Sequence, residues 1–303
     1  MKILVTGVCG QLGYDMVNEL AARGHAVLAT DIIERSARTF FDVESAAARV
    51  PYAVLDITDA DAVDRLLTEH APDAVVHCAA WTAVDLAEMP ENRDRVMAIN
   101  VTGTENLARA CKRVGAKMVY ISTDYVFSGE ADAPYTEECA PAPINAYGRT
   151  KLSGERAVEE SGCRHIILRT SWLYSEFGNN FVKTMQSLMQ TRSEVRVVAD
   201  QIGTPTYAGD LAAAITYIIN SDQLAKCGTY HYSNEGACSW YDFACEIARL
   251  SESNCEVTPC TTEEYPTKAQ RPRYSVLDKS KFIATFGITI PEWHESLAQM
   301  IKR

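Results

Sequence analysis

Short apolar runs alternate with longer amphipathic stretches along the first two-thirds of the chain. The runs Ile3-Leu4-Val5 and Ala74-Val75-Val76 are continuous, which is typical of strands that are covered on both faces. Between such runs, apolar residues recur at helical spacing. The pattern predicts strands at 2–6, 26–30, 53–56, 74–78, 117–122 and 165–169, and helices at 12–23, 60–69, 92–114 and 147–161.

Strands separated by helix-length segments predict βαβ units, and hence a parallel sheet with helices on both faces. We therefore expect an α/β fold with a doubly wound parallel sheet of the Rossmann type. After about residue 170 the alternation is less regular, Pro and aromatic residues are more frequent, and helices are predicted at 209–219 and 241–250. These changes predict a Rossmann domain over 1–170 and a smaller α/β substrate-binding lobe over 171–303, with partly interleaved segments.

The composition narrows the classes of partner. The chain has 303 residues with 29 Lys and Arg against 40 Asp and Glu, so its formal net charge is −11. Such a chain lacks the broad basic surface that binds nucleic-acid phosphates or anionic lipid, and we expect neither partner. The first apolar run is too short for a signal-peptide core or a membrane span, and the ten cysteines show no C-x-x-C spacing. Reduced thiols and a cytoplasmic location are the expectation.

A glycine-rich turn joins the first predicted strand to the first predicted helix. Gly7, Gly10 and Gly13 have the spacing G-x-x-G-x-x-G, followed through Gln11 and Leu12 into the helix. Glycines at these places permit a tight turn and a close approach of the backbone to a pyrophosphate, which the helix N-terminus attracts. Within a βαβ unit this pattern predicts a dinucleotide site.

Carboxylates follow the next two predicted strands. Asp31 ends the second strand, where it can accept hydrogen bonds from the adenosine ribose. This position favours NADH over NADPH, whose extra phosphate a carboxylate repels, although Arg35 lies close by in the sequence. Asp56 and Ile57, after the third strand, are candidates to flank the adenine.

The candidate catalytic residues lie further along the chain. Tyr147 and Lys151 are four residues apart at the start of a predicted helix, so they face the same way. An ammonium beside the phenol is expected to lower its pKa and so tune Tyr147 for proton transfer to a carbonyl oxygen. Thr123, at the end of the fifth strand, is placed to reach the same crevice, whereas Ser122 is expected to point to the opposite face.

With these features in order, the sequence resembles the extended short-chain dehydrogenase/reductases, and within them the dTDP-4-dehydrorhamnose reductase family. The resemblance covers essentially the whole chain. It is carried by distinctive segments at 79–85, 122–129, 169–174, 178–181, 201–206, 239–244 and 271–277.

The resemblance implies an NAD(P)H-dependent reduction of the 4-keto group of dTDP-4-dehydro-L-rhamnose to dTDP-L-rhamnose. In this family pattern Thr123 hydrogen-bonds the keto oxygen, Tyr147 supplies the proton and Lys151 holds the cofactor. Further positions are implied for the two ligands: Ala79 and Ala80 toward the cofactor, and Thr82, Val84, Tyr125, Trp172, Asn180 and Arg271 toward the nucleotide sugar.

Two other functions stay open, and a third is disfavoured. The chain could serve another sugar-nucleotide 4-ketoreductase or epimerase reaction, or be a non-catalytic dinucleotide-binding regulatory subunit. A dehydratase is disfavoured, because that chemistry typically needs Asp-Glu after the strand-end Thr, and this chain has Asp124-Tyr125. A homodimer is an open expectation, and no metal site is predicted.

Overall fold

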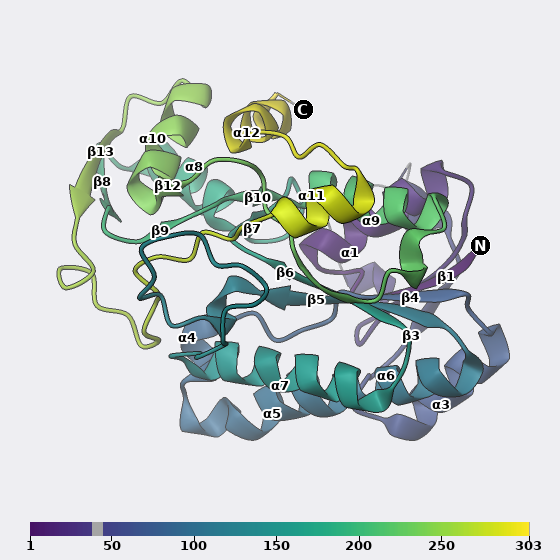
Figure 1. Cartoon of the computed structure of the whole chain (residues 1–303). Helices are drawn as coiled ribbons and strands as arrows, with labels where there is room; N and C mark the ends of the chain where they lie inside the picture. The colour runs from purple at the N-terminus through teal and green to yellow at the C-terminus, as the bar shows by residue number, and fades with distance from the viewer. Residues whose placement is uncertain (38–44, 303) are drawn as a thin grey trace.

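The computed structural model describes residues 1–37 and 45–302, and a seven-stranded parallel sheet lies at its centre (Figure 1). Six of the strands come from the apolar runs predicted above, in the order β6-β5-β4-β1-β2-β3. The strands of this sheet are β1 Lys2–Thr6, β2 Ala26–Asp31, β3 Tyr52–Val54, β4 Ala74–His77, β5 Lys117–Thr123, β6 His165–Thr170 and β11 Gly228–His231. The order reverses between β1 and β4, which places a ligand crevice outside the carboxyl ends of these strands.

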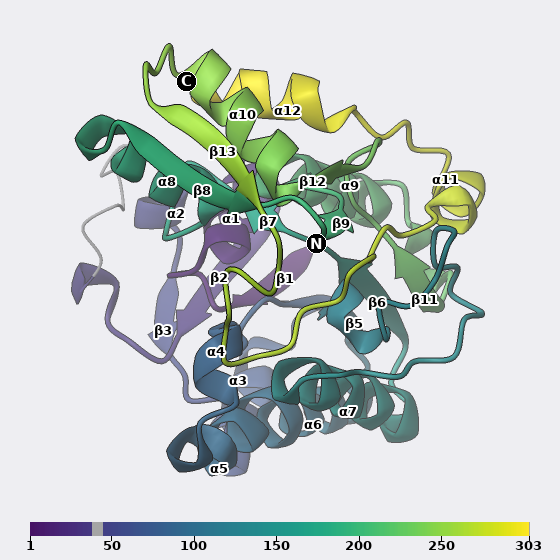
Figure 2. The ribbon, with the colours of Figure 1, turned by 90° about the vertical axis from the view of Figure 1, so that its left-hand side faces the viewer.

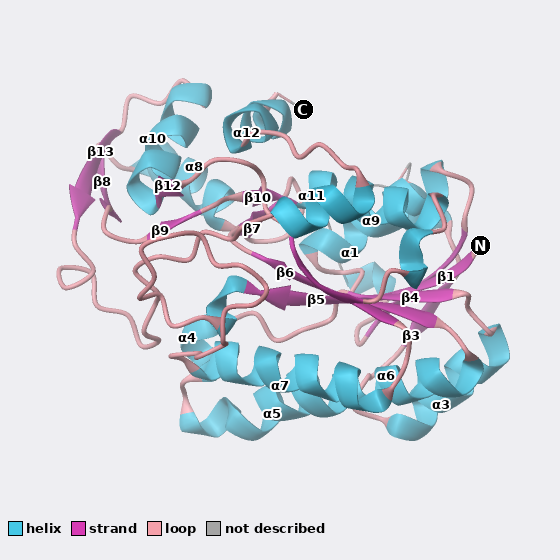
Figure 3. Ribbon diagram, viewed as in Figure 1, coloured by secondary structure: helices cyan, strands magenta, loops and turns pink. Residues whose placement is uncertain are grey.

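Helices cover both faces of the sheet, as its alternating side chains require. Ile3 and Val5 of β1 pack into one apolar core, whereas Leu4 between them packs into the other. One face is covered by α1 Gln11–Ala22, α2 Ala46–Arg49, α9 Ala208–Asn220 and α11 Ser280–Phe286. The opposite face is covered by α3 Ala60–His70, α6 Gly103–Val114 and α7 Ala146–Ser161 (Figure 3).

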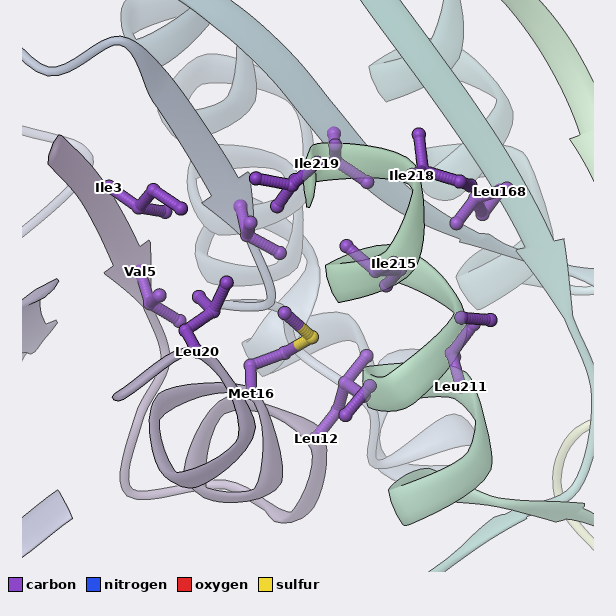
Figure 4. Close-up of a cluster of buried hydrophobic side chains, with 14 of the residues drawn as sticks. Ile3, Val5, Leu12, Met16, Leu20, Leu168, Leu211, Ile215, Ile218 and Ile219 are labelled. Atoms are coloured by element: carbon purple, nitrogen blue, oxygen red, sulfur yellow. The ribbon is translucent and has the colours of Figure 1, made fainter. Parts of the chain in front are cut away.

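The first of these cores joins segments that are far apart in the sequence. Leu12, Met16 and Leu20 of α1 pack with Leu211 and Ile215 of α9 against one face of the sheet (Figure 4). All of these side chains are at most 5% exposed. The last third of the chain therefore completes the core of the first.

A smaller part lies beyond the carboxyl edge of the sheet. Its own core gathers apolar side chains from α8 Phe181–Thr191, β8 Glu194–Val198, α10 Trp240–Leu250, β13 Glu256–Cys260 and α12 Trp293–Ile301. Short strand pairs connect it to the sheet: β7 Leu173–Tyr174 with β10 Thr206–Tyr207, and β9 Ile202–Gly203 with β12 Cys238–Ser239. The loop from β13 to α11 passes close to α4 Val84–Ala87 (Figure 2).

The structure departs from the predicted pattern in two places. The seventh strand, β11, comes from the C-terminal part and pairs with β6. The predicted helix 92–114 is divided into α5 Arg93–Met97, a π-helical segment at Ala98–Thr102 and α6, after a 3₁₀ turn at Pro90–Asn92. In the π-helical segment the buried Asn100 pairs with the backbone of Trp81 and with Thr150, which are tertiary contacts that helical spacing does not reveal.

The remaining 3₁₀ turns lie in connections, at η1 Arg35–Ala37, η4 Asp124–Val126 and η5 Gln223–Ala225. Among the described helices, none combines the length and the apolar composition that a membrane span requires.

Candidate active site

A cavity of about 990 Å³ opens at the carboxyl edge of the sheet. It lies between the strand ends and the smaller C-terminal part. The residues predicted to bind the cofactor or to catalyse all line it: Gly7, Gly10, Gln11, Leu12, Gly13, Asp31, Asp56, Ile57, Ala79, Ala80, Thr123, Tyr147 and Lys151. Thr82, Val84, Tyr125, Trp172 and Asn180, predicted to contact the nucleotide sugar, line it as well.

The glycine turn between β1 and α1 forms one end of this cavity. Gly7 has φ +70°, and a Cβ on it would lie 2.6 Å from Ala79 Cα. A Cβ on Gly13 would lie 2.2 Å from the Gly7 carbonyl oxygen, so α1 packs directly on the turn. No side chain caps the N-terminus of α1, and its first turn has no acidic residue. The free N–H groups and positive helix end therefore suit a pyrophosphate.

Asp31 lies where the cavity passes β2. Its Oδ2 accepts a hydrogen bond from Cys9 N in the glycine turn at 2.9 Å, and its Oδ1 accepts one from Ile32 N. Arg35 turns away from this carboxylate: its guanidinium donates to the carbonyl oxygens of Ala48 and Val50. A carboxylate is thus present in this part of the cavity wall, while the neighbouring Arg35 guanidinium is already bonded to backbone carbonyls.

Tyr147 and Lys151 lie one turn apart near the start of α7. Asn145 caps the N-terminus of this helix, and its side chain accepts a hydrogen bond from Gly148 N at 2.8 Å. Tyr147 is half-buried, whereas Lys151 is 2% exposed, with its Nζ 4.1 Å from the ring centre of Tyr120. The helical spacing that the sequence predicted therefore does bring both side chains to the cavity.

The pKa values correct one step of the sequence argument. Burial and the Asp124 carboxyl raise the pKa of Tyr147 above its usual value, and the Thr123 hydroxyl only partly opposes them. Burial lowers the pKa of Lys151 to about 7, with Glu155 opposing the shift. The expected lowering of the tyrosine pKa by Lys151 is therefore wrong for this structure, because desolvation dominates. The raised pKa keeps the Tyr147 hydroxyl protonated at neutral pH.

The strand-end hydroxyls diverge, as the pleat of β5 predicts. Ser122 donates to Glu155 Oε1 at 2.5 Å, on the side of α7. Glu155 also forms a buried bidentate ion pair with Arg169 of β6, at 2.9 and 2.7 Å. Through Ser122 and Arg169, Glu155 thus ties α7 to both β5 and β6.

Thr123 faces the other way and lies beside the Tyr147 hydroxyl. Its Oγ1 accepts from Tyr125 N at 3.2 Å and donates to Asp124 Oδ1 at 2.9 Å. The rings of Tyr125 and Tyr147 meet edge to face, with their centres 5.9 Å apart. Two hydroxyls and a carboxyl thus converge at one point of the cavity wall.

Two residues predicted to bind the substrate have strong partners of their own. Asn180 caps α8 and donates to Gln11 Oε1 and to the Ser175 carbonyl oxygen. Arg271 lies outside the cavity lining and holds Asp85 at 2.6 and 3.2 Å. To bind a diphosphate, its guanidinium would have to share or exchange this carboxylate.

Among the lining residues that the sequence argument did not assign to the site are Asp124 and Trp240. Trp240 stacks on Trp172 with ring centres 3.6 Å apart and planes 10° apart. Trp172 has φ +45°, and its ring fills the space where Gly203 lacks a side chain. Trp240 belongs to the segment 239–244, which contributes to the family resemblance, but only the folded structure shows that it lies at the cavity. Over residues 1–37 and 45–302, no three His, Cys, Asp or Glu side chains are grouped as metal ligands would be.

The strand order, the uncapped glycine turn and the Thr, Tyr and Lys side chains at one cavity define a dinucleotide-binding short-chain dehydrogenase/reductase. Within this class, residues 1–303 match the family model described as RmlD substrate binding domain, and the chain belongs to that family.

Similar proteins of known name support the assignment of the chain to this family. The dTDP-4-dehydrorhamnose reductase of Escherichia coli is 38% identical over 313 residues, covering 99% of this chain and 97% of that one. A solved dTDP-4-dehydrorhamnose reductase structure from Clostridium acetobutylicum matches with a TM-score of 0.89 and 45% identity, covering 100% of this chain and 99% of that one.

The structure of the Bacillus anthracis dTDP-4-dehydrorhamnose reductase in complex with NADP matches with a TM-score of 0.87 and 40% identity. It covers 99% of this chain and 98% of that one. The protein is therefore an NAD(P)H-dependent oxidoreductase, and its cofactor is a nicotinamide dinucleotide.

Proposed function

We propose that this protein reduces the 4-keto group of dTDP-4-dehydro-L-rhamnose to give dTDP-L-rhamnose. The observation that carries the proposal is the meeting of Thr123, Tyr147 and Lys151 in the cavity that the glycine turn also lines. The named relatives, which share the whole length of the chain, support this choice of sugar nucleotide.

The roles of the side chains follow from their positions. A bound reduced nicotinamide supplies the hydride that goes to C4 of the sugar. Tyr147 gives its hydroxyl proton to the keto oxygen, so that the carbonyl gains one hydride and one proton and becomes an alcohol. Thr123 donates a hydrogen bond to the same oxygen and stabilises the negative charge that develops there. Lys151, deep beside Tyr147, donates to the nicotinamide ribose and orients the phenol.

The proposed binding site for the adenosine half of the cofactor favours NADH over NADPH. Asp31 offers acceptors to the two ribose hydroxyls and repels a phosphate on either of them. Arg35, the nearest cation along the chain, is bonded to the carbonyls of Ala48 and Val50 and stacked over Tyr52. It would have to break these bonds to neutralise the extra phosphate of NADPH.

Thr82, Val84, Tyr125 and Trp172 are proposed to line the sugar and nucleotide site, with Asn180 at its edge and Arg271 toward the diphosphate. The ten cysteines, which all lie in the described part of the chain, form no disulfide there; they support a reducing compartment and hence the cytoplasm as the proposed location. A homodimer is proposed as the assembly, and the sedimentation of the purified chain tests it.

The deciding experiment supplies dTDP-4-dehydrorhamnose through its upstream dehydratase and epimerase and follows oxidation of NADH and of NADPH in parallel. We expect cofactor oxidation only when the epimerised sugar is present. At low cofactor concentration it should be faster with NADH than with NADPH, and it should disappear in Tyr147→Phe. If the cofactor is oxidised only with a different sugar nucleotide, the protein would instead be a ketoreductase for that substrate. Dinucleotide binding without oxidation of either cofactor would instead favour the non-catalytic subunit.

A further inference from the structure

Asp124 is a buried carboxyl in the cavity wall for which the reaction described above has no use. It is 2% exposed, begins the turn η4 directly after Thr123, and lines the cavity. Its Oδ1 accepts the Thr123 hydroxyl proton at 2.9 Å. Its Oδ2 is buried and has no hydrogen-bond partner at ordinary distance among the described residues, although the Ser275 hydroxyl lies near enough to the carboxyl to favour its charged form.

The hydrogen bonds of Thr123 compete for a single hydroxyl proton. A hydroxyl has one proton to donate and two lone pairs to accept with. Thr123 already accepts from Tyr125 N. If its proton goes to an Asp124 carboxylate, none is left for the keto oxygen of a substrate, and the role proposed for Thr123 fails.

We propose that Asp124 carries a proton in the active enzyme and donates it to Thr123 Oγ1, so that the Thr123 hydroxyl donates to the keto oxygen. Asp124 is then a positioning residue that sets the direction of the Thr123 hydrogen bond. The inference rests on the proposed reduction, since it assumes that Thr123 binds the keto oxygen.

The surroundings of the carboxyl favour its neutral form. An ionised carboxylate with one unpartnered oxygen at this depth is costly, whereas a neutral carboxyl needs fewer partners. In the described part of the chain no Lys, Arg or His forms an ion pair with Asp124. The titratable groups that face it are the phenols of Tyr125 and Tyr147.

The Arg271–Asp85 ion pair acts on the neighbouring Tyr125, where the guanidinium lowers the pKa of the phenol and the carboxylate raises it. Burial raises the pKa of Asp124 to about 7, with the hydroxyls of Ser275 and Thr123 opposing the shift. The carboxyl is therefore protonated below about pH 7. Above that pH it ionises and captures the Thr123 proton.

The test is the pH dependence of kcat/KM for the sugar nucleotide in the wild type, Asp124→Asn and the control Asp132→Asn. An amide at position 124 mimics the neutral acid, since its NH₂ group can donate to Thr123 but cannot titrate. Asp132 is an exposed carboxylate whose side chain is 97% accessible, so its replacement should leave the wild-type profile intact.

Lys151 also titrates near pH 7, so the number of protons lost is the decisive quantity. We expect log kcat/KM of the wild type to fall with a slope of about −2 above this range, and that of Asp124→Asn with a slope of about −1. At pH 6 the amide variant should keep its rate to within about threefold. Thr123→Val should lose roughly 10²-fold in rate at pH 6 and also fall with a slope of about −1, because no hydroxyl is left to be captured.

Equal slopes in the wild type and Asp124→Asn would overturn the proposal. So would a wild-type rate that rises through this range and is lost in the amide variant, because the carboxylate would then be the active form. Infrared difference spectra between pH 6 and pH 8 give a reading that needs no turnover: a protonated-carboxyl band should disappear at pH 8 and be missing in Asp124→Asn. If the wild type fails to reduce the sugar but shows this band, the proposed function fails while the protonation stands.

Discussion

Tyr147 combines a phenol that keeps its proton with a place beside Thr123 at the cavity wall. Replacing it with Phe removes the proton donor and leaves the ring. We expect Tyr147→Phe to lower kcat by about 10²–10⁴-fold, the usual contribution of a general acid, and to leave the Kd for NADH nearly unchanged. Stopped-flow turnover and fluorescence titration of NADH measure the two quantities. Turnover close to wild type would remove Tyr147 from the mechanism.

Lys151 places a charge where the fold favours none, so its effects on stability and on activity should have opposite signs. Its pKa is about 7 in the folded chain against an ordinary 10.5. Between these values the unfolded chain binds more protons, so this residue makes stability rise as the pH increases from 7 to 9. Lys151→Met should remove that rise and increase the Tm at pH 7 by a few degrees.

The same variant should bind NADH more weakly and turn over more slowly, because the proposed ribose contact and the partner of Tyr147 are gone. Thermal unfolding at pH 7 and pH 9, together with NADH titration, tests both halves. Lys117→Met is a suitable control, since this lysine lies outside the cavity lining. A lower Tm in Lys151→Met would show that the ammonium stabilises the fold.

At the scale of elements, the contact between α1 and the glycine turn should tolerate no added atom. The Cβ of an alanine at 13 would lie 2.2 Å from the Gly7 carbonyl oxygen, whereas one at 10 would lie 3.2 Å from it. Gly13→Ala must therefore push α1 away from β1. We expect it to cost about 1–3 kcal/mol of unfolding free energy and to weaken NADH binding more than tenfold.

Gly10→Ala is the matched control, in the same turn and with the same added methyl group. We expect its unfolding free energy to stay within about 0.5 kcal/mol of the wild type. Urea unfolding of the two variants measures the difference. Equal losses at both positions would mean that the turn relaxes, and that glycine is not needed for this packing.

The sequence pattern predicts those helices and strands whose burial is uniform. It fails for segments whose conformation depends on contacts with residues distant in the chain. The first six strands of the sheet have apolar runs, so their existence could be inferred. The strand β11, Gly228-Thr229-Tyr230-His231, has no such run; it is an edge strand that pairs with β6. The π-helical segment around Asn100 likewise depends on partners at Trp81 and Thr150, distant in the chain.

For the site, spacing was sufficient to place Tyr147, Lys151 and Thr123 at one cavity. It could not give their electrostatics. Whether an ammonium four residues away lowers the pKa of a phenol depends on how deeply each is buried, and here burial dominates for both. Asp124 was missed for the same reason: a carboxyl after a strand is ordinary in a sequence, and its depth is known only from the fold.

At the scale of the whole molecule, the two parts should unfold together. The α1 face of the sheet is closed by α9 and α11, so residues such as Leu211 and Phe282 share a core with Ile3 and Leu12. A chain cut after residue 170 would expose this face and lose the strand β11 as well. The proposed division into a dinucleotide-binding domain at 1–170 and a substrate lobe at 171–303 thus describes function and not independent folding.

We therefore expect a single calorimetric transition, with equal calorimetric and van't Hoff enthalpies. Saturating NADH should move that whole transition upward, since ligand at 100 times its Kd adds about 2.7 kcal/mol. A fragment of residues 1–170 should lack a cooperative transition, while the full chain serves as the control. Two separate transitions in the full chain, with only the first moved by NADH, would contradict the shared core, because α9 would then have to leave α1 before the sheet unfolds.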